Sequence, residues 1–185
     1  SVETGRVFGE SAKFAGVDEL EEAVMALKDG ISETLDKRGG EMFAKVETPE
    51  ERLGRLKKLV EGKALPKVYV NIPEEHITTA IPDPAAETEI RKTLQDLGFP
   101  LVAREDAAEQ IIEGEAFSEV AGRRGNLISC RARVEVKIHK KDSETIKVER
   151  QTSVAVDIAE TVAAKSALEK AGMQLAERLL PLLVE

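Results

Sequence analysis

Apolar and polar residues alternate with a period of two along Leu127–His139, the pattern of a strand with one buried face. The side chains expected inside are those of Ile128, Cys130, Ala132, Val134, Val136 and Ile138. Lys140–Ser143 predicts a hairpin turn, and Glu144–Val156 predicts a returning strand whose inward residues are Ile146, Val148, Val154 and Val156. Arg150 and Thr152 fall on the same face, which indicates a bulge in this strand.

Helical spacing of apolar residues, three and four apart, marks four other stretches. They are Val17–Arg38, Thr48–Glu61, Pro84–Leu97 and Asp157–Leu180. Gly39–Gly40 should end the first helix and Pro181 the last, because glycine and proline commonly follow a helix. Asp83 and Asp157 are expected to cap the last two. Val2–Ser11 has weak strand character.

The order of elements around Lys67–Phe99 predicts the fold class. An apolar run at Val68–Ile72, the helix Pro84–Leu97 and a second run at Leu101–Val102 form a strand–helix–strand crossover. Gln110–Phe117 reads as a third strand. We therefore expect an α/β fold: a mixed sheet of four to five strands with a βαβ crossover, then an antiparallel meander (Gln110–Val156), packed by helices and a closing C-terminal helix. Residues 1–65 would form an N-terminal helical region and 66–185 the α/β domain.

Composition narrows the class of partner. The 185 residues carry a net charge of −8 and only 3% aromatics, which argues against a nucleic-acid partner because such binding relies on neutralising phosphates. Cys130 is the single cysteine, so no internal disulfide can form. The chain contains no apolar run of membrane-spanning length and starts at Ser1 without Met, so an upstream signal or anchor is expected to have been removed.

The loop Pro73–Asp83 carries one candidate ligand or hydrolase site: Glu74, Glu75, His76 and Asp83. Loops that follow strands often hold sites in α/β sheets, and a carboxylate beside a histidine can perform acid–base chemistry. The competing interpretation is a solvated loop in which Asp83 only caps the next helix. His76, His139 and Cys130 show no ligand spacing, so we expect no metal, no cofactor and no catalytic residues.

Basic residues on one face of the Leu127–His139 strand form the second candidate site. Arg131, Arg133 and Lys137 share that face and could bind an anionic partner such as a glycan, a lipid headgroup or an acidic protein. The alternative is a solvated face paired with acidic neighbours.

Five segments resemble a known family. They are KVYVNIPEEHI, IPDPAAETEIRKTLQDLGFPLV, IIEGEAFSE, SCRARVEVKI and VDIAETVAAKSALEKAGMQLAERLLP. Together they resemble the CsgG-like cell-envelope family, which includes the curli-secretion lipoprotein CsgG, FlgT and LpoB-like proteins. Two departures are a shortened helix at Arg104–Glu109 and the lack of a membrane-inserting hairpin, which argues against a secretion pore.

The resemblance implies a non-enzymatic, lipoprotein-like module of the periplasm or outer membrane that assembles with other envelope proteins or with its own copies. Peripheral membrane association through a removed N-terminal anchor would fit it. A cytoplasmic location stays open as the alternative, as does a small-molecule binding protein or hydrolase that uses the loop Pro73–Asp83.

Overall fold

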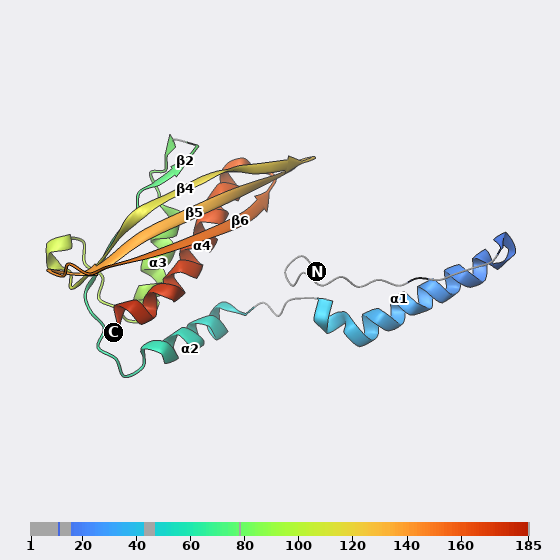
Figure 1. Cartoon of the computed structure of the whole chain (residues 1–185), viewed down its shortest axis with the longest axis horizontal. Helices are drawn as coiled ribbons and strands as arrows, with labels where there is room; N and C mark the ends of the chain where they lie inside the picture. Colours follow the sequence, from blue (N-terminus) through green and yellow to red (C-terminus); the bar gives the residue numbers. More distant parts are fainter. Residues whose placement is uncertain (1–10, 12–15, 43–46, 78, 185) are drawn as a thin grey trace. The chain divides into compact units, whose positions relative to one another are not determined.

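The computed structural model describes residues 11, 16–42, 47–77 and 79–184, and the chain forms two compact units, residues 1–48 and 49–185. Figure 1 shows the elements of each unit. The first unit contains a short 3-10 helix, Val17–Glu19, and helix α1, Leu20–Met42. The predicted helix is confirmed, but it runs through Gly39–Gly40, where it was expected to end. The strand expected at Val2–Ser11 lies, except for Ser11, outside the described residues.

A mixed sheet forms the centre of the second unit and confirms the predicted fold class. Its strands, among the described residues, are β1 (Val68–Asn71), β2 (Glu74–His76), β3 (Thr79–Ala80), β4 (Gln110–Arg124), β5 (Leu127–Lys140) and β6 (Ile146–Asp157). The order is β3-β2-β4-β5-β6, and β1 pairs with β4 beside β2. β1 and β2 run parallel to β4, whereas β4, β5 and β6 form the predicted antiparallel meander.

The crossover connects β1 to β4 through helix α3, Ala85–Asp96. The second strand predicted at Leu101–Val102 is reduced to one parallel bridge between Leu101 and Val68. A 3-10 turn, Glu105–Ala107, occupies the place of the shortened helix. β2 and β3 were not predicted, because their 3 and 2 residues are too short to show a periodic pattern.

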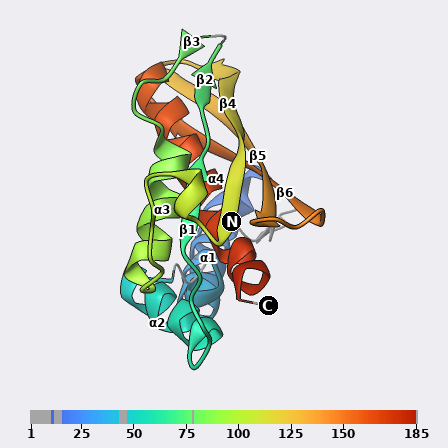
Figure 2. The same ribbon diagram turned by 90° about the vertical axis from the view of Figure 1, so that its left-hand side faces the viewer.

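Two helices cover one face of the sheet: α3 and α4, Glu160–Leu183 (Figure 2). The predicted inner residues of α3, from Ala86 to Leu97, are buried as expected. α4 continues through Pro181, where it was expected to end, and Leu183 is buried in the core. Helix α2, Pro49–Val60, packs on α4 with Leu56 and Val60 inside.

The alternation of β5 is confirmed, but the sidedness of β6 is the reverse of the prediction. All six residues expected inside β5 are buried. Val148 pairs with Lys137 and Val154 pairs with Arg131, so the apolar side of β6 shares the polar side of β5. Paired residues of neighbouring strands point to the same face. No register shift interrupts β6; the irregularity lies in β4, between Val120 and Gly122.

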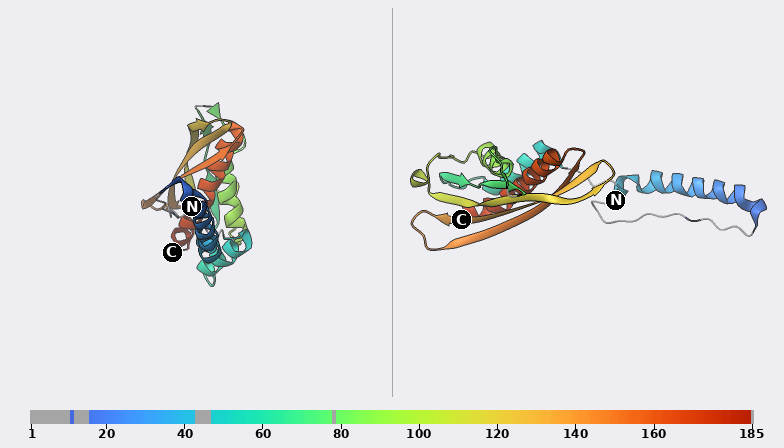
Figure 3. Two further views of the ribbon diagram at one scale, coloured as in Figure 1. Left: turned by 90° about the vertical axis from the view of Figure 1, so that its right-hand side faces the viewer. Right: turned by 90° about the horizontal axis from the view of Figure 1, so that it is seen from above.

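The sheet face opposite α3 and α4 is called the open face below. It is formed by Glu113, Glu115, Phe117, Glu119, Arg131, Arg133, Glu135, Lys137, Ile146, Val148, Arg150, Thr152, Val154 and Val156. In Figure 3 (right), α3 and α4 lie on one side of the yellow and orange strands, and no described helix of this unit lies on the other.

Candidate functional site

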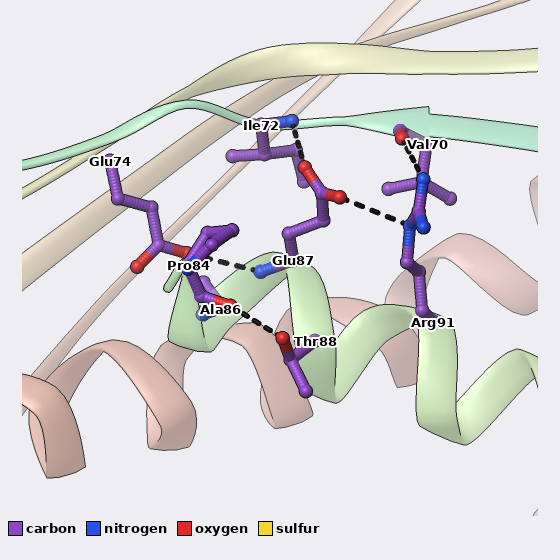
Figure 4. Close-up of polar contacts among 8 residues, drawn as sticks. All are labelled: Val70, Ile72, Glu74, Pro84, Ala86, Glu87, Thr88 and Arg91. Atoms are coloured by element: carbon purple, nitrogen blue, oxygen red, sulfur yellow. Dashed lines mark hydrogen bonds and ion pairs between the residues drawn. The ribbon is translucent and has the colours of Figure 1, made fainter. Parts of the chain in front are cut away.

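The predicted ligand loop is not an open loop, because Glu74 is turned inward and caps α3. Its side chain is 2% exposed. Its two carboxylate oxygens accept the backbone N–H groups of Ala85, Ala86 and Glu87 at 2.8, 2.6 and 3.1 Å. Figure 4 shows Glu74 reaching from the strand to the start of this helix. The carboxylate therefore satisfies three of the N–H groups that a helix start leaves unpaired.

This finding corrects the role predicted for Asp83. The N-cap residue of α3 is Pro84, and it makes no side-chain cap bond. The exposed carboxylate of Asp83 instead pairs with Lys165 of α4 at 2.6 Å. The hydrogen bond and charge of Asp83 raise the pKa of the Lys165 ammonium. Glu75 is exposed on the strand between Glu74 and His76.

Burial and hydrogen bonding act on Glu74 in opposite directions. Loss of water raises the pKa of its carboxyl above the usual value, while the three backbone N–H groups lower it and the nearby Glu87 raises it. Removal from water is the largest of these effects, so the net direction is upward.

Glu87 and Arg91 complete the connection between α3 and the outer edge of β1 (Figure 4). The Ile72 N–H donates to Glu87 at 2.7 Å, and Arg91 donates to the Val70 carbonyl at 2.8 Å. The two side chains also pair with each other at 3.1 Å. They supply hydrogen bonds to strand groups that β4, on the other side of β1, cannot reach.

His76 lies in a row with Ser118 of β4 and Glu160 of α4. Its Nδ1 is 2.9 Å from the Ser118 hydroxyl, and its Nε2 is 3.4 Å from the Glu160 carboxylate. A hydroxyl, an imidazole and a carboxylate in a row are the parts of a nucleophilic triad. Ser118, however, is only 1% exposed, so a substrate cannot reach its oxygen. These contacts connect β2 to β4 and to the start of α4.

Sequence reasoning missed Ser118 and Glu160, since they lie 42 and 84 positions from His76. Asp157, which was expected to cap α4, lies two residues before the N-cap residue Ala159 and accepts its N–H, and Glu160 in the first turn faces His76. The four residues of the predicted ligand loop do not converge. Glu74 points into the core, His76 toward Ser118 and Asp83 toward Lys165.

Cys130 is buried, as expected for a small apolar residue. Burial is the larger cause that raises the pKa of its thiol, and the charge of Glu160 adds to it. A raised pKa makes the thiol a poor nucleophile at neutral pH. Among the described residues, no group of three or more His, Cys, Asp or Glu side chains could hold a metal ion.

The basic residues of the second candidate site lie on the open face, and two of the three have acidic partners. Arg131 pairs with Glu119 across to β4, and Arg133 pairs with Glu135 beside it on β5. Arg133 is the first cause that lowers the pKa of the Glu135 carboxyl. Lys137 makes no side-chain hydrogen bond or ion pair within the described part of the chain. The open face is thus less cationic than the sequence indicated.

Apolar side chains dominate the β6 part of the open face, and we call them the apolar strip. Ile146, Val148, Val154 and Val156 are all about half exposed or more, and Val148 reaches 65%. Phe117 of β4 is exposed on the same face. The signal that could have revealed this surface is the register itself, because a hairpin joining two alternating strands places their facing partners on one side.

A groove of about 380 Å³ opens beside this apolar strip. Its walls include Glu113, Glu115, Lys137 and Val148 of the open face, together with Asn71 at the end of β1 and Pro73 after it. Glu113 and Glu115 make no side-chain hydrogen bond or ion pair with any residue that the structure describes. The groove therefore places free carboxylates beside an exposed valine.

Comparison with known proteins gives distant structural similarities only. No family model matches the sequence, and no curated protein matches it significantly. A minor lipoprotein from Acinetobacter baumannii aligns at 14% identity over 66% of this chain and 92% of its own, with a TM-score of 0.44. A rare lipoprotein B from Shewanella oneidensis aligns at 11% identity over 60% and 91%, with a TM-score of 0.34.

A hypothetical protein from Chlamydia trachomatis aligns at 12% identity over 62% and 96%, with a TM-score of 0.40. The chain thus has a distant structural similarity to bacterial lipoproteins. The CsgG-like family is not named among these three structures, so that finer resemblance stays a prediction. Within the described residues, no helix has the length and apolar character needed to cross a membrane.

Proposed function

We propose that this chain is a non-catalytic assembly module of the cell envelope that binds another envelope protein through its open face. One observation carries the proposal: the apolar residues of β6 lie exposed on the face that α3 and α4 leave open. Single exposed apolar residues are common, but several of them on one strand face are typical of an interaction surface. The envelope location is supported by the resemblance of five sequence segments to CsgG-like domains.

The residues around the apolar strip are polar and charged, as at the rim of a protein–protein interface. Ion pairs such as Arg131–Glu119 and Arg133–Glu135 lie beside the apolar strip and would form a polar rim. Arg131, Arg133 and Lys137 would then orient the partner, since charges at a rim act mainly on specificity and association rate.

The groove indicates the chemistry of the partner. Glu113 and Glu115 are free carboxylates, and Val148 is an apolar contact beside them. A partner segment with an apolar side chain followed by a lysine or arginine would satisfy both. A second copy of this chain is the alternative occupant, and the experiment below separates the two.

Site-specific photo-crosslinking tests the proposal in cells of the source organism. A benzophenone amino acid would replace Val148 or Val154 on the open face, and Lys170, exposed on α4, as the matched control. We expect an adduct with one defined envelope protein from the first two positions and none from Lys170. An adduct of twice the mass of this chain would indicate self-association. Equal or absent labelling from all three positions would contradict the proposal.

A second candidate function is a hydrolase, because the row Ser118–His76–Glu160 contains the groups of a nucleophilic triad. Pure protein would be screened against ester, amide and glycoside substrates together with the variants Ser118→Ala and His76→Ala. We expect no turnover that depends on these residues, because the Ser118 hydroxyl is buried. A turnover lost in both variants would refute the non-catalytic proposal.

A further inference from the structure

One end of the second unit gathers exposed apolar side chains away from the groove. Here β4 turns into β5, β6 ends and α4 begins. The hairpin end, as we call it, consists of Arg123, Arg124, Leu127, Val156, Ile158 and Val162. Ile158 is 73% exposed and Leu127 is 50% exposed. Apolar surface in contact with water is unfavourable, so a partner that covers these side chains would gain free energy.

The strand register places Arg124, Leu127 and Val156 on one face of this end, whereas Arg123 pairs with the buried Ile128 on the other. Arg124 pairs with Leu127 across the β4–β5 turn, and Val156 pairs with Ser129 two residues further along β5. Ile158 directly follows β6. The first turns of α4 pack on this end of the sheet, since Ala163 and Ala164 form a buried cluster with Ile128 and Cys130. In Figure 2 the start of α4 (orange) and the end of β4 lie at the same end of the sheet.

Two cations at the turn make no direct ion pair. Arg123 and Arg124 make no side-chain hydrogen bond or ion pair with any described residue. Of the carboxylates at this end, Glu119 is paired with Arg131, while Asp157 and Glu160 keep their charges and contact the Ala159 N–H and His76. The net charge of −8 belongs to the whole chain, and charges beyond a screening length of about 8 Å act weakly here.

We propose that the hairpin end binds the surface of an anionic lipid bilayer. Leu127, Val156 and Ile158 would enter the boundary between headgroups and acyl chains, while Arg123 and Arg124 contact the phosphates. Apolar side chains beside basic ones are the combination that holds a protein at a membrane interface. This inference does not rest on the open-face proposal, although Val156 belongs to both surfaces.

The expected strength of bilayer binding follows from the two arginines and from the apolar side chains. A basic residue near an anionic surface contributes about 1 kcal/mol, which is about a fivefold change in partitioning. Replacing Arg123 and Arg124 by glutamine should therefore weaken binding by about 25-fold. Removing the apolar contact in Ile158→Ser should weaken it by about tenfold or more, given the exposed area of this side chain.

Vesicle co-sedimentation of the full chain tests the inference. The probes are vesicles of phosphatidylglycerol mixed with phosphatidylcholine, and vesicles of phosphatidylcholine alone. We expect binding to the anionic vesicles, weaker binding to the neutral ones, and the losses above in Arg123→Gln/Arg124→Gln and Ile158→Ser. Val148→Ser is the matched control. Val148 is comparably exposed and lies on β6, but outside the hairpin end, so the vesicle binding of this variant should equal that of wild type.

Circular dichroism would test whether each variant is folded, which we expect because every altered side chain is exposed. Absence of wild-type binding to anionic vesicles, or equal binding by all variants, would overturn the inference. In the first case, an adduct with an acidic protein from a benzophenone placed at Leu127 would assign the hairpin end to a protein partner. An effect of Val148→Ser alone would assign vesicle binding to the open face instead.

Discussion

Truncating Glu74 should cost far more stability than truncating Asp83, although the sequence alone assigns the helix cap to Asp83. In Glu74→Ala, three backbone N–H groups at the start of α3 lose their acceptor. Two of them belong to Ala85 and Ala86, which are buried, so water cannot replace the carboxylate. Asp83→Ala removes only an exposed ion pair with Lys165, in which the Asp83 side chain is 79% exposed.

The magnitudes separate the two variants. Loss of an N-cap acceptor costs about 1 kcal/mol, and a buried donor left unsatisfied costs about 1–3 kcal/mol. Relief of the buried charge of Glu74 offsets part of this, because burial opposes its ionisation. We therefore expect a loss of about 3 kcal/mol in the free energy of unfolding for Glu74→Ala, against about 0.5 kcal/mol or less for Asp83→Ala.

Urea unfolding followed by far-ultraviolet circular dichroism measures both values, and the slopes should agree among the variants. Glu74→Gln serves as a second control, since it keeps the size of the side chain and one oxygen acceptor; its loss should be intermediate. A Glu74→Ala variant within about 0.5 kcal/mol of wild type, or a larger loss in Asp83→Ala, would refute this assignment of the cap.

The raised pKa of Glu74 predicts a pH dependence with a defined sign. The folded protein holds this proton more tightly than the unfolded chain, whose carboxyl titrates near 4.5. The resulting stability is fully present below that value and is lost as the pH rises through the folded pKa. The difference in unfolding free energy between wild type and Glu74→Gln should therefore shrink as the pH rises from 4.5. A difference that grows with pH would contradict the direction.

Three further predictions concern single residues. Gly172→Ala would place a Cβ 2.6 Å from the Ala86 carbonyl oxygen, so α3 and α4 must separate. We expect the free energy of unfolding in urea to fall by about 2 kcal/mol, and an unchanged value would contradict this contact. Ile77 has φ of 45°, which a β-branched residue adopts only with strain, so Ile77→Asn should raise the melting temperature. A lower melting temperature would show that the lost contacts of the isoleucine side chain outweigh the relief of backbone strain. Cys130 should react with a thiol reagent only after unfolding, and rapid labelling of native protein would disprove its burial.

The sequence by itself determined the helices and the strand β5. Their apolar spacing is a local property, because residues three or four apart share a helix face and alternate residues share a strand face. The ranges predicted for α2 and α3 therefore agree with the structure to within a residue or two. The mixed α/β fold followed from the order of those elements.

Tertiary structure decided which side of β6 is buried. The alternation of this strand is the same whichever side faces the core. Its pairing with β5 places Val148 beside Lys137, and the helices cover the opposite side. Register and layer position are relations between distant segments, so the pattern of β6 alone could not reveal the open face.

The cap of α3 shows the same division at a single residue. Local rules select Asp83 because it stands next to the helix start. A cap requires only an acceptor near the free N–H groups, however, and Glu74 is carried there by the parallel pairing of β2 with β4. His76 meets Ser118 and Glu160 by the same pairing and by the packing of α4. The residue types at these positions were visible in the sequence, but their partners were set by contacts between segments 11 to 84 positions apart.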